Sequence, residues 1–275
     1  MPELPEVETL VRGLREGTAS TPPLPGMIIT KATLSWPRHV AEPSPTAFRQ
    51  RIRERTILDV KRRGKHFLFP LDQGTLLIHL GMSGDLRLAT ADAPPDRFQH
   101  TVFHLEGGWQ LRFNDARKFG RLRLLDDPTS FLSALGPEPL DAGFKAEDLR
   151  ARIQGRRRAL KPLLLDQSFL AGVGNIYADE ALHRARLHPL RPANTLTPAE
   201  VRQLHRSIRA ALRQGVRHNG ASIDWVFRGG GFQNHFRVYG RADHPCPVCK
   251  TPVQRIVVAQ RGTHLCPSCQ PEIVS

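Results

Sequence analysis

The residues of this chain that could do chemistry begin at its N-terminus, where Pro2 and Glu3 follow Met1. Initiator methionine is readily trimmed before small residues, which would leave Pro2 with a free secondary amine. An α-amino group has a pKa near ~8, against ~10.4 for lysine, so a useful fraction is unprotonated at neutral pH. Attack of such an amine on a sugar C1′ ends in a cationic iminium, an electron sink suited to eliminations. Glu3 could then supply or accept protons.

The same residues also fit an ordinary helix start. Pro5 is typical of the first helical position, and Glu6 and Glu8 would lie in the first turn, where the helix dipole favours anions. Gly13 or Gly17 could weaken or end the helix. The apolar residues at helical spacing are Val7, Leu10, Val11 and Leu14. This interpretation explains Glu6 and Glu8 but says nothing of Pro2, so both interpretations stay open.

Four cysteines near the C-terminus form two C-x2-C pairs separated by sixteen residues: Cys246, Cys249, Cys266 and Cys269. Four thiolates in paired turns match a tetrahedral zinc site, and a site without an open position predicts one structural rather than catalytic ion. The span between the pairs fits a β-hairpin with a first strand at 253–259. Its tip, 260–263, would present Arg261 where a phosphate could sit.

Three further segments combine cations, glycines and apolar side chains. Lys65 follows Gly64 and precedes an apolar strand, which favours a cleft, although a basic run is usually a solvated face. Met82 lies between glycines on a loop, where it suits wedging into a base stack but could also be a stray core residue. The segment 114–120 interleaves cations with an aromatic ring, as DNA-distorting loops do. Its members include Arg117, Lys118 and Phe119.

The segment 170–180 predicts a helix, a glycine turn and a second helix capped by Asn175. Gly172 and Gly174 would let a backbone phosphate approach the free N–H groups of the following helix. The segment lacks the preceding strand of a dinucleotide fold and the Lys-Ser/Thr of a P-loop, which disfavours nucleotide binding. An ordinary helix-turn-helix connection is the alternative.

Composition points to a polyanionic partner. The 275 residues include 40 Lys and Arg against 26 Asp and Glu, a net charge of +14. Such a basic chain suits nucleic acid, although RNA, ribosomes or anionic lipid would also fit. No run of eighteen apolar residues and no secretory signal is present, so we expect neither a membrane-spanning nor a secreted protein. An intracellular nucleic-acid-binding protein, cytoplasmic and nucleoid-associated, is the expectation.

The chain changes character after Leu125. Before it, short strands suggest an antiparallel sandwich or barrel packed by the first helix, with a hairpin turn at Gly107-Gly108. The predicted strands are 28–29, 57–60, 66–69, 75–80, 101–105, 109–113 and 121–125. Beyond a Pro/Gly linker at 135–141 the pattern is helical, with an apolar stripe over 156–166. Thr197–Glu200 predicts a capping box that opens an amphipathic helix.

Together these residues resemble the formamidopyrimidine-DNA glycosylases of the Fpg/Nei superfamily over essentially the whole chain. The motifs are in family order: 2–9, 79–84, 172–180 and the four-cysteine finger. The version at 4–9 is similar to the purine-directed branch rather than the endonuclease VIII branch. The resemblance implies an α+β fold: a catalytic β-sandwich domain with a flanking helix, then a helix-two-turn-helix domain and a C4 zinc-finger hairpin. The implied boundaries are 2–134 for the sandwich, 135–142 for the linker, 143–236 for the helical domain and 237–275 for the finger.

The resemblance also implies a role for individual residues. Pro2 would be the Schiff-base nucleophile, Glu3 the acid/base that opens the deoxyribose, and Glu6 a residue that holds the site. Lys65 would donate the proton for β-elimination and Arg261 would serve δ-elimination. The implied DNA-binding residues are Met82, His100, Arg117, Phe119, Arg156, Lys161 and Asn175. Two positions depart from the family pattern: Phe98, where relatives commonly carry histidine, and Ala116, where proline is more usual.

The implied function is a bifunctional DNA glycosylase and AP lyase of base excision repair that acts, as a monomer, on oxidised purines in double-stranded DNA. Oxidised or abasic sites in the duplex would be its substrates. An endonuclease VIII-like preference for oxidised pyrimidines is one alternative. A non-enzymatic zinc-ribbon nucleic-acid-binding protein is another, in which Pro2 and Glu3 would be a mere helix cap. Gly220–Asn234 is the expected lesion loop.

Overall fold

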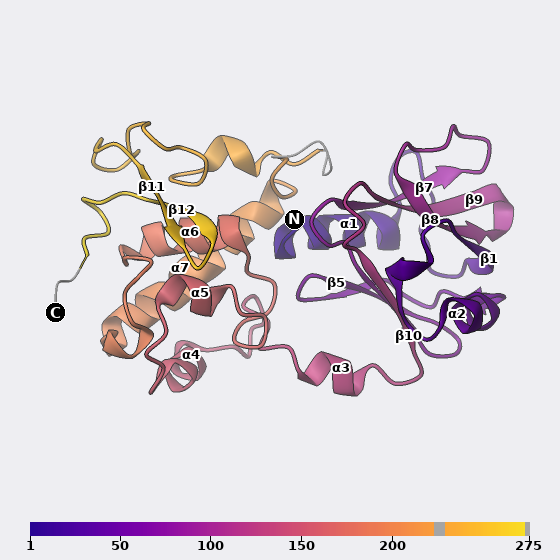
Figure 1. The fold of residues 1–275 in the computed structure, drawn as a ribbon, viewed down its shortest axis with the longest axis horizontal. Coiled ribbons are helices and arrows are strands. Elements are labelled where there is room, and N and C mark those ends of the chain that lie inside the picture. The colour runs from indigo at the N-terminus through magenta and orange to yellow at the C-terminus, as the bar shows by residue number, and fades with distance from the viewer. Residues whose placement is uncertain (223–228, 273–275) are drawn as a thin grey trace. The chain divides into compact units, whose positions relative to one another are not determined.

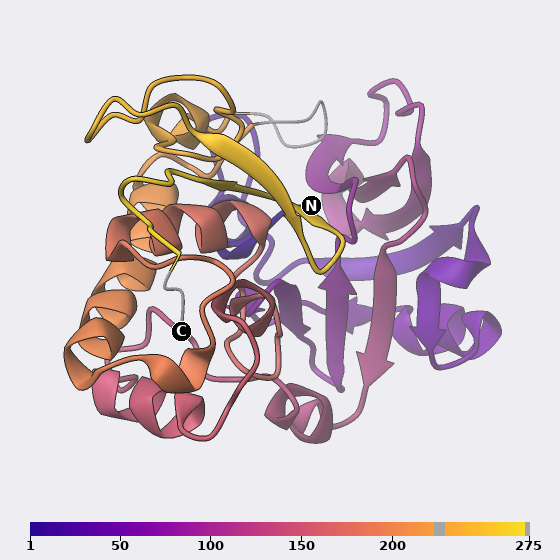
Figure 2. The same cartoon turned by 60° about the vertical axis from the view of Figure 1, so that its left-hand side comes forward.

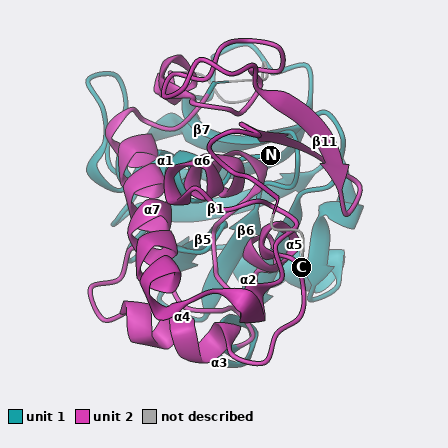
Figure 3. Ribbon diagram, turned by 90° about the vertical axis from the view of Figure 1, so that its left-hand side faces the viewer, with its two compact units in different colours: residues 1–133, 222–228 teal, residues 134–221, 229–275 magenta. Residues whose placement is uncertain are grey.

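The strand-rich and helix-rich parts of the chain form two separate units (Figure 1, Figure 3). The computed structural model describes residues 1–222 and 229–272. Among them, unit 1 comprises residues 1–133 with Ser222, and unit 2 comprises 134–221 and 229–272. No helix in these described ranges is both long and apolar enough to cross a membrane.

Unit 1 is a sandwich of two five-stranded sheets, ordered β3-β1-β8-β9-β7 and β2-β10-β6-β5-β4. All neighbours pair antiparallel except β2 and β10, which are parallel. The strands are β1 (Ile28–Leu34), β2 (Val40–Glu42), β3 (Arg55–Thr56), β4 (Lys61–Arg63), β5 (His66–Pro70), β6 (Thr75–His79), β7 (Gly84–Thr90), β8 (Gln99–Leu105), β9 (Trp109–Asp115) and β10 (Arg121–Leu125). The predicted sandwich is confirmed.

The core of unit 1 follows from the pattern of its elements. Along β5, Phe67 and Phe69 are fully buried while their neighbours are less so, as expected for a strand with one face in the core. Helix α1 (Leu4–Glu16) contributes Val7, Val11 and Leu14 to the same apolar cluster. Each such side chain stabilises the fold by roughly 1.5–3 kcal/mol when fully buried. The other helices are α2 (Pro45–Ile52) and α3 (Thr129–Ser133).

The prediction of a strand at 57–60 is wrong. The strand β3 ends at Thr56, and Ile57 makes only an isolated bridge to Leu71. Ile57 and Val60 are buried in the core, but Leu58 is 56% exposed, and the Asp59 carboxylate accepts the Val60 N–H that a sheet would need. The short strands β2 and β4 and the long strand β7 were not predicted.

Unit 2 consists of helices and a C-terminal hairpin. Its elements are α4 (Ala146–Ile153), α5 (Leu160–Leu164), α6 (Asn175–Ala185), α7 (Pro198–Arg217), β11 (Gln254–Val258) and β12 (Arg261–Leu265). The capping box predicted for α7 is confirmed: Thr197 Oγ1 accepts from the Glu200 N–H, and the Thr197 N–H donates to the Glu200 carboxylate at 2.8 Å. Helix α6 packs against α7 and against β12 (Figure 2).

The helix predicted over 156–166 is shorter than expected, because its first residues pair with a distant segment. The carbonyls of Arg156 and Arg158 accept from the backbone N–H groups of Asn194 and Ala193, at 2.9 and 3.0 Å. The Leu160 N–H in turn donates to the Arg191 carbonyl at 2.9 Å. These tertiary bonds replace helical ones, so α5 begins only at Leu160.

The Pro/Gly segment after Leu135 is bonded to unit 2. The Gly136 N–H donates to the Gln167 carbonyl at 2.8 Å, and Arg209 Nη1 donates to the carbonyls of Pro139 and Asp141 at 2.7 and 2.6 Å. A Cβ on Gly136 would lie 2.5 Å from the Phe169 carbonyl carbon, so only glycine fits. The domain boundaries given above stay a prediction.

Candidate functional site

The N-terminal pair Pro2 and Glu3 is buried at the start of α1. The backbone N–H of Glu3 donates to Glu6 Oε2 at 2.8 Å, and Glu6 is itself only 2% exposed. This arrangement is a capping box with glutamate at both positions. Glu6 therefore holds the backbone directly beside Pro2, so the helix-start and site-holding interpretations describe one and the same contact.

Lys65 lies in the β4–β5 turn and is only 5% exposed. The turn needs Gly64, whose φ is +57°, and Arg62 Nη1 donates to the Gly64 carbonyl at 3.0 Å. Arg62 Nε also donates to Glu8 Oε2 at 2.9 Å, which ties the turn to α1. Burial acts to raise the pKa of Glu8, but the hydrogen bonds and charges of Arg62 and Arg12 together outweigh it and lower that pKa. The contact between Arg62 and Glu8 thus joins the turn that carries Lys65 to helix α1.

The loops that carry Met82, Arg117 and Phe119 converge on a buried carboxylate, Asp115. Asp115 accepts from Ser83 Oγ at 2.6 Å and from the Gly120 N–H at 2.7 Å. Phe119 is 50% exposed, and the Arg117 guanidinium lies 5.1 Å from the centre of its ring. Asp115 lies within the segment 114–120, and nothing in the sequence around it predicted this role.

His100 lies on β8 beside a second histidine. Its ring meets that of the buried His39 edge to face, at 5.7 Å between centroids. Burial, followed by the charges of His39 and Lys118, lowers the pKa of His100. His100 Nε2 has no hydrogen-bond partner within the described residues. A neutral ring with a free nitrogen could bond to a phosphate oxygen or a water.

In unit 2, Arg156 and Asn175 have different surroundings. Arg156 is exposed; its Nε donates to the Arg152 carbonyl at 2.9 Å, which leaves its other nitrogens available to a ligand. The predicted capping role of Asn175 is wrong. The N-cap of α6 is Gly174, and Asn175 Nδ2 instead donates to the Gly262 carbonyl of the hairpin at 3.0 Å. The Asn175 side chain therefore connects α6 to β12.

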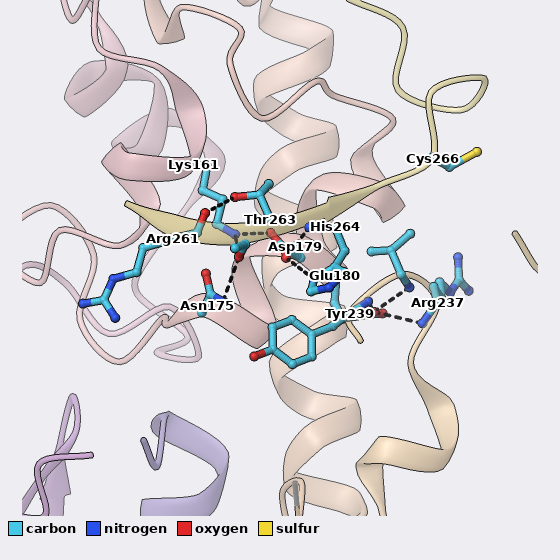
Figure 4. A network of polar contacts seen from close by, with 12 residues as sticks. Lys161, Asn175, Asp179, Glu180, Arg237, Tyr239, Arg261, Thr263, His264 and Cys266 are labelled. Atoms are coloured by element: carbon cyan, nitrogen blue, oxygen red, sulfur yellow. Dashed lines mark hydrogen bonds and ion pairs between the residues drawn. The ribbon is translucent and has the colours of Figure 1, made fainter. Parts of the chain in front are cut away.

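Lys161 is not placed to bind DNA, in contrast to the prediction. Its side chain is completely buried, and its Nζ lies 2.5 Å from Asp179 Oδ1 and 3.2 Å from the Gly262 carbonyl oxygen (Figure 4). The other oxygen of Asp179 accepts the His264 N–H at 2.9 Å. A buried lysine requires such a paired anion, and the pair connects α5, α6 and β12. Lys161 is therefore an anchor of the hairpin.

Arg261 is the first residue of β12 and lies directly after the hairpin turn. The turn residues Ala259 and Gln260 both have positive φ, of 47° and 61°, as in the tight turns that join antiparallel strands. The Arg261 side chain is exposed and extends away from the buried network (Figure 4). The prediction of a rigidly held cation near the tip is thus consistent with the backbone around it.

The four cysteines of unit 2 are positioned to bind a metal ion. Their Sγ atoms all lie within 4.8 Å of one another, and all four are free thiols. A tetrahedral ion with metal–sulfur distances of ~2.3 Å would separate its ligands by about 3.8 Å, which this cluster accommodates. The Cys246 and Cys266 sulfurs also accept backbone N–H groups, from Val248 and Cys269, at 3.5 Å each.

Two residues of α6 for which no role was predicted, Glu180 and His183, contact the finger and the segment before it. Glu180 Oε1 accepts three consecutive backbone N–H groups, those of Arg237, Val238 and Tyr239, at 2.9, 2.9 and 3.1 Å. Burial raises the pKa of Glu180. His183 Nε2 lies 3.4 Å from Cys246 Sγ. An acidic residue within a buried helical stretch was the only available signal for Glu180.

Comparison with known proteins covers the same three regions. Residues 1–122 match the formamidopyrimidine-DNA glycosylase N-terminal domain, residues 135–226 its H2TH domain, and residues 243–271 a zinc finger found in FPG and IleRS. The formamidopyrimidine-DNA glycosylase of Roseiflexus sp. is 48% identical over 278 residues, covering 98% of this chain and 100% of the relative. That of Herpetosiphon aurantiacus is 44% identical with the same coverage.

The chain belongs to the formamidopyrimidine-DNA glycosylase family. A solved complex of the Lactococcus lactis Fpg with DNA containing an abasic site has a TM-score of 0.91 and 35% identity, covering 98% of this chain and 100% of that one. A complex with DNA containing Fapy-dG has a TM-score of 0.90 at the same identity. The protein is thus a DNA-repair glycosylase that acts on damaged DNA, with a DNA-binding zinc-finger fold and a cysteine metal site.

Proposed function

We propose that this glycosylase is bifunctional: it excises oxidised purines, 8-oxoguanine and formamidopyrimidines, from duplex DNA and then cleaves the strand by β,δ-elimination. The observation that carries the proposal is the buried Pro2-Glu3 pair, held by Glu6 at the start of α1. A secondary amine fixed beside a carboxyl group is what an imine mechanism at C1′ requires. Oxidised pyrimidines are the alternative lesions.

In this mechanism Met1 is removed and the Pro2 nitrogen attacks C1′. The glycosidic bond breaks, and the base leaves as it gains a proton. Glu3 protonates the ring oxygen, so that the sugar opens to the iminium. The Glu3 carboxylate, having given up its proton, then takes the C2′ proton, and the electrons of the C2′–H bond pass into the iminium. The 3′ phosphate leaves with a proton donated by Lys65. Arg261 holds phosphate for the second elimination at the 5′ side.

The DNA contacts in this proposal lie on both units. Met82, Arg117 and Phe119 fill the gap that a flipped base leaves, at a cost in unstacking of a few kcal/mol. His100, Arg156 and Asn175 bind backbone phosphates, Asn175 through the second N–H of its Nδ2, whose first N–H is donated to the Gly262 carbonyl. The preferred ligand is double-stranded DNA with an oxidised base or abasic site, bound by a monomer in the cytoplasm at the nucleoid. The lesion loop at 220–234 lies partly outside the described residues.

The metal in this proposal is one structural zinc ion. Four thiolates fit zinc, and a fully thiolate-ligated site leaves no position for substrate. Zinc would hold together the two C-x2-C turns that flank the hairpin. The catalytic residues would be Pro2, Glu3, Lys65 and Arg261.

Two variants separate binding from chemistry. Glu3→Gln keeps the amine but removes the ionisable proton carrier, so single-turnover excision of 8-oxoguanine opposite cytosine should fall about 10²-fold or more. Pro2→Gly replaces the secondary amine with a primary one. It should greatly reduce the fraction of protein that borohydride links covalently to lesion DNA. Binding of the same duplex in a gel shift should stay near the wild-type affinity in both.

The wild-type protein supplies the reference for these variants. Intact mass shows whether Met1 is removed, and borohydride should link the protein covalently to lesion DNA. A duplex with an oxidised pyrimidine tests the alternative substrate. Wild-type excision by Glu3→Gln, or no trapping by a protein that lacks Met1, would overturn the mechanism and leave the helix-cap interpretation.

Phosphate contacts are tested by salt. The affinity for intact duplex should fall with a log–log slope of about −0.9 per phosphate contact. Arg156→Ala should make that slope shallower by about one contact. Arg150→Ala, on α4, is the control because it removes a cation for which we propose no contact. An unchanged slope in Arg156→Ala excludes Arg156 as a phosphate ligand.

A further inference from the structure

Asp115 stands at the end of β9, where two loops meet. Its side chain is completely inaccessible, and its carboxylate accepts from both loops: Ser83 Oγ at 2.6 Å from one, and the Gly120 N–H at 2.7 Å from the other. The Arg117 N–H donates to Asp115 Oδ1 at 3.3 Å and to Ser83 Oγ at 2.9 Å. On the remaining side lies His39, with its Nε2 3.6 Å from Asp115 Oδ2. One carboxylate therefore joins the two loops through short bonds.

The two loops are also packed backbone to backbone. A Cβ on Gly81 would lie 2.7 Å from the carbonyl carbon of Phe119, at a φ of +65° that other residues rarely adopt. A Cβ on Gly120 would lie 2.2 Å from the ring of Phe113 and 3.1 Å from Asp115 Oδ2. No side chain fits between the loops, so a shift of one loop must move the other.

The charge of Asp115 strengthens these bonds. Burial alone would raise its pKa, but the nearby His39 ring, together with hydrogen bonds from Ser83 and the Gly120 N–H, lowers the pKa of Asp115 to about 2. The group is therefore an anion at neutral pH, and hydrogen bonds to an anion are roughly twice as strong as neutral ones.

We propose that Asp115 is the positioning residue for base flipping: one buried carboxylate that sets Met82 and the Arg117–Phe119 pair in a fixed relation, so that all three enter the DNA stack together. This rests on the proposed role of these three side chains as gap-fillers. None of the bonds to Asp115 uses the side chains of Met82, Arg117 or Phe119, so Asp115 acts through the backbone and through Ser83. Its loss should impair insertion of the wedge and spare chemistry on a sugar that is already unstacked.

The test is Asp115→Asn, which keeps the shape but replaces one oxygen with an NH2 group. If the amide oxygen takes the Ser83 side, the NH2 faces the Gly120 N–H, donor against donor. Excision of 8-oxoguanine from duplex DNA should then fall about tenfold or more, the effect of one unsatisfied buried donor. Borohydride trapping on a single-stranded oligonucleotide with an abasic aldehyde, which has no stack to fill, should stay within about twofold of wild type. Asp127→Asn is the matched control, since Asp127 also accepts a backbone N–H in unit 1 but lies outside both loops.

A readout of flipping completes the test. 2-Aminopurine opposite or beside the lesion brightens when unstacked, and the rate of that change should fall in Asp115→Asn and be unchanged in Asp127→Asn. If Asp115→Asn does not fold, Ser83→Ala removes one of the donors and should slow the same step by a smaller factor. Wild-type flipping and excision, or an equal loss on duplex and single-stranded substrates by a folded variant, overturns the proposal. The fluorescence change does not depend on imine formation, so it reports flipping even if the Pro2 mechanism is wrong. Failure of this proposal and failure of the Pro2 mechanism are therefore distinguishable.

Discussion

Among the described residues, each unit contains one fully buried aspartate that joins loops or strands, and the two are satisfied in different ways. Asp115 in unit 1 accepts from Ser83 and from backbone N–H groups, with His39 nearby. Asp179 in unit 2 is paired with the ammonium of Lys161, which is equally buried, and with the His264 N–H. The first is an anion among mostly neutral donors, whereas the second is half of a buried ion pair.

The comparison indicates how each region is held. Around Asp115 the apolar core of the sandwich is continuous, and the carboxylate only sets the loops at its edge. The finger has a much smaller apolar cluster, formed by Val238, Val253 and cysteines, so the ion pair and the metal carry more of its stability. Single changes to the finger or to the ion pair that holds it should therefore cost more stability than changes around Asp115.

The largest expected effect is that of the metal. Removal with a chelator, or Cys249→Ser, should loosen β11–β12 and the segments around the cysteines, because zinc-finger peptides gain about 10–16 kcal/mol from their ion. Hydrogen exchange should rise in 243–271 and stay low in the strands of unit 1. Weaker DNA binding through Arg261 should follow. Full incision activity by a metal-free protein would contradict a structural role for the metal.

Lys161→Met should destabilise unit 2 by about 3–5 kcal/mol, because it leaves the Asp179 carboxylate buried without its counter-charge. The measurement is denaturant unfolding followed by hydrogen exchange at β12. The double variant Lys161→Met with Asp179→Leu is the control, and it should recover most of the loss because no buried charge remains. A single variant as stable as wild type would mean that the ion pair does not anchor the hairpin.

Acid should weaken the Asp115 cluster at a defined pH. The pKa of Asp115 is lower in the folded protein, about 2, than its ordinary value of 3.8, so its contribution is complete above pH ~4 and is lost as the pH falls towards 2. The contribution is about 2 kcal/mol, from the size of the shift. The difference in unfolding free energy between wild type and Asp115→Asn should shrink by that amount from pH 5 to pH 2. A difference independent of pH would contradict the ionised state of Asp115.

Ser83→Ala should have the smallest effect, about 1 kcal/mol, since it removes one neutral donor while the Arg117 N–H keeps its bond to Asp115. Thermal unfolding of unit 1 measures it, with Ser133→Ala on α3 as the control for loss of an exposed hydroxyl. A loss as large as that of Lys161→Met would remove the proposed contrast between the two aspartates.

Much of the architecture was predictable because it depends on local periodicity. Alternating strands, the Gly107-Gly108 turn and the Thr197–Glu200 capping box depend on residues a few positions apart, and the structure confirms them. The strand predicted at 57–60 does not form beyond the isolated bridge of Ile57, because an apolar run does not by itself show that each residue pairs with a neighbouring strand. The helix at 156–166 was shortened because its first residues pair with 191–194.

Individual roles of polar side chains were less predictable. The family resemblance implied DNA binding by Lys161, yet its partners are Asp179, 18 residues away, and the Gly262 carbonyl, 101 residues away. The sequence predicted that Asn175 caps a helix, yet its side chain donates to the Gly262 carbonyl, 87 residues away. The spacing of residues in the sequence does not predict such long-range contacts.

By itself the sequence determined the two kinds of unit, the cysteine metal site and the order of the motifs, because periodicity and spacing are covalent properties of the chain. Only the tertiary structure decided which charges are buried together. In the folded protein Lys161 is paired with Asp179, and Asp115 accepts hydrogen bonds from two loops. His183 likewise lies beside Cys246. A buried charge must find its partner wherever the fold brings one, and that partner is set by long-range packing rather than by neighbours in the chain.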